Sequence, residues 1–366
     1  MRSTLDELIA ELMELKTLVD SIGPVNDALA GLKDTLVQRY ISIRRRFDYV
    51  AFAVALYSSF EKFVENLITE YVQLETRCVD YSQLLEKLQD KHLTGSAALL
   101  AQYKRLGEGR YIGMSKLGVV KNLFDCLNGN KPYTLNAAAV VAHNANLRTS
   151  EVDAVFGVVG IDKICDRICC ADAMMAWYRT VKSLKAQPEN GVPRTVIDER
   201  LKDIVDRRNQ IAHRGSNPTE LLGSVAMGDA VDFIKSLATS ILGFVVGRYL
   251  QTHHVASTNC IELALRPGNS LYRKRTIVVV DKPAQRLFVG QPVFAIVKST
   301  GARWGRIKSL RIDDSDIQEI EENSSAPNGI GVGLDFKYPN GADEKLIALQ
   351  EDDDTVWSPL EKVTDT

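Results

Sequence analysis

One arginine and one histidine, Arg208 and His213, stand five residues apart near the end of a predicted helix. The ordinary pKa of histidine lies near neutrality, so its side chain can take a proton from a ribose hydroxyl or give one to a leaving oxygen. A planar guanidinium stabilises negative charge on phosphate oxygens. The pair therefore has the chemistry to cleave the phosphodiester bond of RNA without a metal ion or any other cofactor.

A purely structural role for the same residues is the alternative. An arginine on an apolar stripe can lie along the surface or pair with a carboxylate such as Asp206, and a histidine in a last helical turn gains stability from the helix dipole. The R-x4-H spacing also arises by chance. Asn209 shares a helix face with His213, so we expect it to orient the imidazole or bind phosphate, or else to make a local backbone bond.

Apolar residues at helical spacing predict the helix that carries the pair: Ile197, Leu201 and Ile204. Arg208 continues this stripe, so a charge lies where the core or an interface should be. Thr195 with Asp198 is typical of a capping box at the start of the helix, and Gly215 is expected to end it. Asn217, followed by a proline, is expected to cap the next helix and to fix the corner that holds the histidine.

The geometry of an ideal helix separates the two side chains. Five residues turn the chain by about 500°, so Arg208 and His213 point about 140° apart. They cannot both face one small substrate from a regular helix. Either the helix unwinds at the corner, or the site combines residues of two protomers.

The string from Arg208 to His213 resembles the R-N-x-x-x-H signature of HEPN-domain ribonucleases, and Arg214-Gly215 continues it as in many members. The segment S-S-F-E-K-F-V at 58–64 resembles a helix near the start of RiboL-PSP-type HEPN domains, and residues 144–148 are similar to the insert before the motif helix. The likeness covers residues from about 40 to about 250.

This resemblance implies a helical bundle that forms a homodimer, in which two motifs meet to make one metal-independent endoribonuclease site. Arg208 and His213 are then catalytic, with Asn209 and Glu61 in support. For Glu61 the alternative is a glutamate at the edge of the core, paired with Lys62 or an arginine. The resemblance also implies a toxin or anti-phage defence role, with RNA as substrate and an antitoxin or other defence-system partner.

Composition and charge indicate a soluble cytoplasmic protein. The 366 residues are 45% hydrophobic and 25% charged, and the formal net charge of −2 excludes an overall basic field for RNA. RNA contacts must come from local clusters such as Arg207 and Arg214, which are otherwise a solvated face. The acidic N-terminal region is unlike a signal peptide, the apolar run 49–57 is too short to cross a membrane, and no cysteine spacing suggests a metal site.

The predicted fold class is α+β, an all-α HEPN-like helical bundle followed by a small β-barrel-like domain. Leucine spacing that stops at Gly23-Pro24 indicates an N-terminal helical hairpin or coiled-coil segment over 1–45. The HEPN-like domain follows over 46–255. Five β-rich segments, at 276–280, 292–297, 305–312, 331–336 and 345–349, predict an SH3-like or OB-like domain over 260–350. Residues 351–366 are expected to be a solvated acidic tail.

Two other classes of function remain open at this point. One is a non-catalytic RNA- or nucleotide-binding helical protein. The other is a scaffold in a toxin–antitoxin-like complex, recruited through the N-terminal segment. The sequence has no glycine-rich phosphate loop, no G-x-S-x-G and no H-E-x-x-H, so it supports no other class of enzyme.

Overall fold

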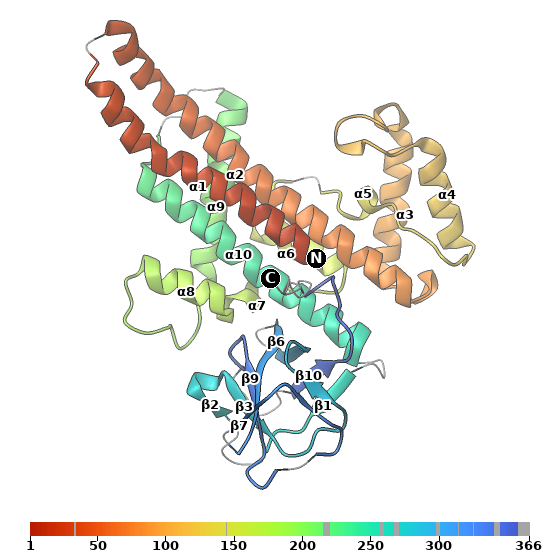
Figure 1. Cartoon of the computed structure of the whole chain (residues 1–366). Helices are drawn as coiled ribbons and strands as arrows, with labels where there is room; N and C mark the ends of the chain where they lie inside the picture. The colour runs from red at the N-terminus through yellow and green to blue at the C-terminus, as the bar shows by residue number, and fades with distance from the viewer. Residues whose placement is uncertain are drawn as a thin grey trace, which may run out of the picture. The chain divides into compact units, whose positions relative to one another are not determined.

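The chain forms two compact units that divide between Leu242 and Gly243 (Figure 1). We call them the helical unit and the β unit, and together they make the chain an α+β protein. A computed structural model describes residues 1–32, 34–143, 145–214, 220–255, 260–266, 271–297, 301–313, 315–324, 326–339 and 345–357.

Among the described residues, ten α-helices make up most of the helical unit, and the last of them continues into the β unit. They are α1 (Arg2–Ala30), α2 (Thr35–Cys78), α3 (Glu86–Ala101), α4 (Lys116–Leu127), α5 (Ala137–Val140), α6 (Thr149–Val158), α7 (Ile164–Arg167), α8 (Asp172–Val181), α9 (Arg194–Arg214) and α10 (Ser224–Leu250). The core is built mainly on α2 and α10, whose apolar side chains include the fully buried Phe60, Leu67, Phe233 and Leu237.

Helices α1 and α2 lie side by side as an antiparallel hairpin (Figure 1). The amino group of Met1 pairs with Glu70, and Lys62 Nζ lies 2.9 Å from Glu11 Oε1. A helical hairpin at the N-terminus is therefore present. The division expected between residues 45 and 46 falls inside α2, which is one continuous helix of 44 residues.

The expected end of the first helix at Gly23-Pro24 is wrong, because α1 runs through Pro24 to Ala30. A proline inside a helix removes one backbone hydrogen bond, to the carbonyl four residues earlier. That carbonyl belongs to Asp20, and both residues are exposed, so water can bond to the released oxygen.

Two expected helix starts also need correction. Helix α9 begins at Arg194, so Thr195 lies inside it and caps nothing. Asp198 instead accepts a bond from Arg194 Nε at 2.8 Å. Helix α10 begins at Ser224, after non-helical residues 220–223, so the expected start beside Asn217 is wrong. The cap residue itself and Gly215 lie outside the described residues.

The β unit contains an antiparallel sheet curled into a half-barrel. Its strands are β1 (Cys260–Leu263), β2 (Leu271–Tyr272), β3 (Ile277–Val280), β5 (Pro292–Val297), β6 (Gly301–Ile312), β7 (Ser315–Ile317), β9 (Ile330–Leu334) and β10 (Lys345–Leu349), and β4 (Leu287–Phe288) pairs separately with β8 (Glu319–Ile320). The order is β1-β10-β5-β6-β9-β3-β2, with β7 on β6. All five predicted strands are present.

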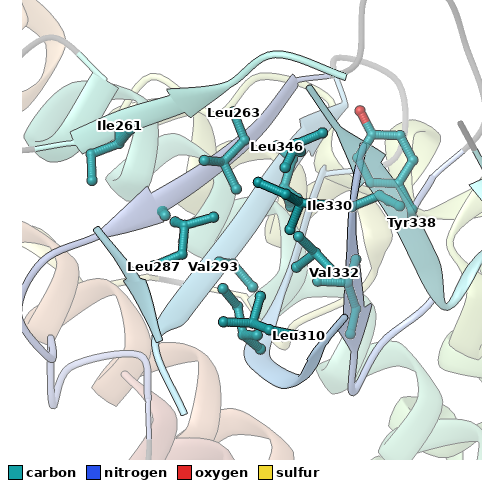
Figure 2. Packing of buried hydrophobic residues seen from close by; sticks show 14 of the residues in the cluster. Ile261, Leu263, Leu287, Val293, Leu310, Ile330, Val332, Tyr338 and Leu346 are labelled. Atoms are coloured by element: carbon teal, nitrogen blue, oxygen red, sulfur yellow. The ribbon is translucent and has the colours of Figure 1, made fainter. Parts of the chain in front are cut away.

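Alternate residues of these strands fill the interior of the half-barrel. Figure 2 shows Leu263, Val293, Leu310, Val332 and Leu346 converging in one cluster. A backbone bridge between Leu265 and Val280 links the chain after β1 to β3. The curl therefore gives the β unit an apolar core of its own.

Residues 351–357, expected as part of a solvated acidic tail, are bonded to the rest of the chain, although Glu351, Asp352 and Asp354 are exposed as expected. Asp352 accepts two bonds from the Arg306 guanidinium at 2.7 and 3.1 Å, and Asp353 accepts one from the Tyr249 hydroxyl at 2.6 Å. Burial alone would raise the pKa of Asp353, but hydrogen bonds from His254 and Tyr249 hold it well below its ordinary range. The segment is thus bonded into the β unit, and residues 358–366 lie outside the described part.

In the described part of the chain, helix α10 and the π-helical turn after it, η5 (Gln251–Val255), form a long apolar stretch. By length and composition the stretch 224–255 could cross a membrane, so the expectation that no apolar run is long enough is wrong by this measure. However, 67% of its most apolar window is buried in protein. A helix that is apolar on all sides and buried is typical of a protein core.

Glycine is required on α3 where that helix meets α5. A Cβ on Gly95 would lie 2.5 Å from the carbonyl oxygen of Ala139. We expect Gly95→Ala to lower the free energy of unfolding by about 1–3 kcal/mol through overpacking. The matched control is Gly23→Ala, where nothing lies within 4 Å, and which should raise it by about 0.5–1 kcal/mol. Urea unfolding of both variants measures the two effects, and equal shifts would contradict the close approach.

Candidate functional site

The motif residues lie on α9, which is helical without a break from Arg194 to Arg214. Ile197, Leu201 and Ile204 are buried along one stripe, as the sequence predicted. Arg208 on the same stripe is half-buried, whereas His213 is exposed. The helix does not unwind between the two residues, so that alternative is wrong and their side chains diverge.

Arg208 packs against an aromatic ring from the long hairpin helix. Its guanidinium carbon lies 5.3 Å from the centre of the Tyr57 ring on α2, and its Nη1 donates a long bond of 3.4 Å to Asn209 Oδ1. Within the described part of the chain, no carboxylate forms an ion pair with Arg208. The ring thus positions a positive charge that keeps donors for an anionic ligand.

Tyr57 and Glu61 are one turn apart on α2 and are joined by a hydrogen bond. The Tyr57 hydroxyl donates to Glu61 Oε1 at 2.9 Å and accepts from the backbone N–H of Leu147 at 3.0 Å. Burial raises the pKa of Tyr57 well above its ordinary value, and the negative charge of Glu61 raises it further. The hydroxyl therefore stays protonated and ties the chain before α6 to α2.

Asn209 is held by the same segment. Its Oδ1 accepts a bond from Asn146 Nδ2 at 3.0 Å, and nearby Arg148 Nη2 lies 2.6 Å from Asp206 Oδ1 on α9. Asp206 is thus paired with Arg148 and not with Arg208. The structure brings Arg208, Asn209 and Glu61 into one network, while His213 is not bonded to any of them among the residues described.

The two residues expected to bind RNA beside the motif are placed differently. Arg207 is half-buried and engaged, with Nε 2.8 Å from Asp203 Oδ2 and Nη1 donating to the Tyr49 hydroxyl at 3.2 Å. Both partners raise the pKa of Arg207 although burial opposes them. Arg214 ends α9, and its side chain lies outside the described residues. RNA binding by this pair stays a prediction.

Sequence reasoning missed three members of the network, Tyr57, Asn146 and His143. Tyr57 precedes Glu61 by four residues, so helical spacing alone would have found it as a partner. Asn146 lies in the insert that resembled HEPN domains, but no spacing rule links it to Asn209. His143 Nε2 lies 3.2 Å from Glu65 Oε1 and 3.8 Å from Glu61 Oε1. Contacts between segments this distant in sequence come from the tertiary fold.

We expect the Tyr57 hydroxyl to make a measurable contribution to the free energy of unfolding. Tyr57→Phe keeps the ring beneath Arg208 but leaves the buried N–H of Leu147 without its acceptor. We expect the free energy of unfolding to fall by about 1–3 kcal/mol. Tyr103→Phe, at a half-exposed ring, is the control and should change it by less than about 0.5 kcal/mol. Urea titrations of the two variants test this, and equal midpoints would argue against the bond.

Comparison with known proteins identifies the family of the chain. No curated protein matches the chain. The sequence model of the RiboL-PSP-HEPN family matches residues 16–246, which include α2, the segment that carries Asn146 and the whole of α9. This match covers well over half of the chain and contains every member of the network described above. The chain therefore belongs to the RiboL-PSP-HEPN family.

Proposed function

We propose that this protein is a metal-independent endoribonuclease in which Arg208 and His213 are the catalytic residues. His213 moves protons to and from the ribose 2′-hydroxyl and the leaving oxygen, and Arg208 stabilises the charge that develops on the phosphate. Membership of a HEPN family supports a role on RNA. Asn209 and Glu61 are the supporting residues, and the proposed mechanism uses no cofactor.

The observation that carries the proposal is the environment of Arg208. Its guanidinium is half-buried over the Tyr57 ring, and no described carboxylate neutralises it. A purely structural arginine at this depth is expected to be paired, because an unpaired buried charge is costly. A phosphate group supplies the missing negative charge and matches the planar donors of the guanidinium.

The proposed site is shared by two protomers of a homodimer. Arg208 and His213 diverge on an unbroken helix, so one protomer does not present both to the same phosphate. A twofold axis close to α9 pairs the Arg208 of one protomer with the histidine of the other. The exposed His213 is free to reach across such an axis.

We further propose a toxin or anti-phage defence role in the cytoplasm, held in check by an antitoxin or another partner of the defence system. An enzyme that cuts cellular RNA must be restrained, and nothing in the described residues covers the exposed His213. In the described part of the chain no two cysteines are joined by a disulfide, which is usual in a reducing compartment.

The test is cleavage by the purified full-length chain of labelled RNA and of DNA of the same sequence, with and without EDTA. Attack by the 2′-hydroxyl leaves a 2′,3′-cyclic phosphate or its opened product and a 5′-hydroxyl end, and it spares DNA and a single 2′-deoxy position. Loss of cleavage on chelation, or cutting of DNA, would overturn the proposal. RNA that is bound but never cut would select the non-catalytic alternative.

A further inference from the structure

A second histidine is buried beside the proposed site. The His143 side chain is 8% exposed and precedes α6 in the chain. Its Nδ1 lies 2.7 Å from the carbonyl oxygen of Ala145, and its buried Nε2 lies 3.2 Å from Glu65 Oε1 and 3.8 Å from Glu61 Oε1 on α2. Both ring nitrogens therefore meet oxygens that only accept hydrogen bonds.

This geometry selects the protonated imidazole. In a neutral ring one nitrogen carries a lone pair, which here would face either a carbonyl or two carboxylates in a site closed to water. The imidazolium carries an N–H at both nitrogens, and its charge at Nε2 lies 3.2 Å from Glu65 Oε1 as an ion pair without hydrogen-bond geometry. The Glu65 carboxylate raises the pKa of His143 above its ordinary value, although burial opposes the shift.

Other polar and charged groups lie around the imidazole and its two carboxylates. Arg110 in the 3-10 turn η3 (Gly109–Tyr111) places Nη2 2.7 Å from Glu65 Oε1, and Glu61 accepts the Tyr57 hydroxyl. From α3, Lys91 Nζ donates to the carbonyl oxygen of Ala142 at 2.5 Å. Two cations and two carboxylates thus lie around His143 and balance one another, so protonation of the imidazole gives the cluster a net charge of +1.

The chain just after this histidine carries the contacts that hold the motif. We call residues 145–148 the strap. Leu147 donates its backbone N–H to the Tyr57 hydroxyl, Asn146 donates to Asn209, and Arg148 pairs with Asp206. The strap is therefore fastened to α2 and to α9, and His143 anchors its start against α2.

We propose that His143 is a positioning residue whose imidazolium, clamped between Glu61 and Glu65, fastens the strap and so fixes Asn209 and the Tyr57–Glu61 pair for RNA cleavage. The inference rests on the proposed ribonuclease function. The pKa of the His143 imidazole is raised in the folded protein. The imidazole is therefore fully protonated, and the clamp complete, below about pH 6.5. As the pH rises through the raised pKa, the imidazole loses its proton, the clamp is released and the strap loosens.

The clamp is tested first without RNA, on the full-length chain. We expect the NMR titration of the His143 imidazole to have its midpoint above about 6.5, and the exchange protection of the Leu147 amide to fall over the same pH range. His143→Gln should give low Leu147 protection at every pH. His253→Gln, in the β unit, is the matched control and should change neither measurement. A midpoint at or below the ordinary value, or flat protection, overturns the proposal.

The second test is the pH profile of RNA cleavage. His143→Gln should lower the rate about 10- to 100-fold at pH 6, where the wild type is clamped, and should remove the part of the alkaline loss that follows His143, leaving the part that belongs to proton transfer by His213. His143→Lys, which keeps a cation, should retain more activity than the glutamine variant and also lack the part of the loss that follows His143. Circular dichroism excludes a folding defect in either variant.

The outcomes separate the clamp from the ribonuclease. If Leu147 protection follows His143 protonation but no RNA is cut at any pH, the clamp stands and the proposed function fails. If RNA is cut and His143→Gln keeps the wild-type rate and pH profile, the positioning role is overturned and the ribonuclease stands.

Discussion

His213→Ala should lower the rate of RNA cleavage by roughly two to four orders of magnitude, because it removes the group that transfers protons. The imidazole is exposed, so the variant should keep the wild-type circular dichroism and unfolding midpoint. Gln210→Ala is the matched control, since Gln210 is also an exposed side chain on α9. Cleavage is followed with a labelled RNA at fixed pH. Full activity in His213→Ala would remove this residue from the mechanism.

Arg208 needs two variants, because its side chain also packs on Tyr57. Arg208→Ala loses that packing as well as the charge. Arg208→Lys keeps a positive charge but lacks the planar set of donors. If the guanidinium stabilises charge on the phosphate, both variants should show large losses of rate, with lysine the milder. Wild-type rates in the lysine variant would show that any nearby cation suffices.

The second large effect is recovery of activity in a mixed dimer. Arg208→Ala and His213→Ala chains are coexpressed with different tags, and the dimers that carry both tags are purified. Each mixed dimer then contains one intact Arg208 and one intact His213, on opposite protomers. If the site is shared across the axis, these dimers should recover about half of the wild-type rate, since one of two equivalent pairs is intact.

The control for this recovery is a dimer in which both tagged chains carry the same substitution, which should stay inactive. A mixed dimer as inactive as that control would place Arg208 and His213 of one protomer in the same site. Sedimentation of the wild type establishes whether a dimer forms at the concentrations used. A monomer of full activity would contradict the shared site.

Periodicity predicted the parts of this molecule that depend on local pattern. The buried stripe of Ile197, Leu201 and Ile204 and the five β-rich segments are present because alternation and helical spacing decide which face is buried. Predictions that took a single residue as the start or end of a helix were wrong at Pro24 and Thr195. At such positions packing on neighbouring helices outweighs the local preference.

The site itself was predicted only in part. The short motif identified Arg208, Asn209 and His213, and the resemblance added Glu61, which lies in the same network. His143 and Asn146 belong to a connecting segment, and the packing of α2, α6 and α9 places this segment beside the site. The acidic residues near 352 were misread for a similar reason, since their partner Arg306 lies 46 residues away. Charge patterns along a chain do not reveal such partners.

Helix α10 decides where the β unit of this protein can be cut for exchange with another protein. It starts at Ser224 and ends at Leu250, and the two compact units divide within it, after Leu242. In the β unit, Gly247 packs so closely on Ala302 that a Cβ would lie 2.9 Å from its nitrogen. Val245 and Leu250 are buried and lie in the part of α10 that belongs to the β unit, so a graft that keeps α10 whole but replaces the strands would separate them from the rest of their unit. The exchangeable module is therefore the half-barrel together with the last two turns of this helix.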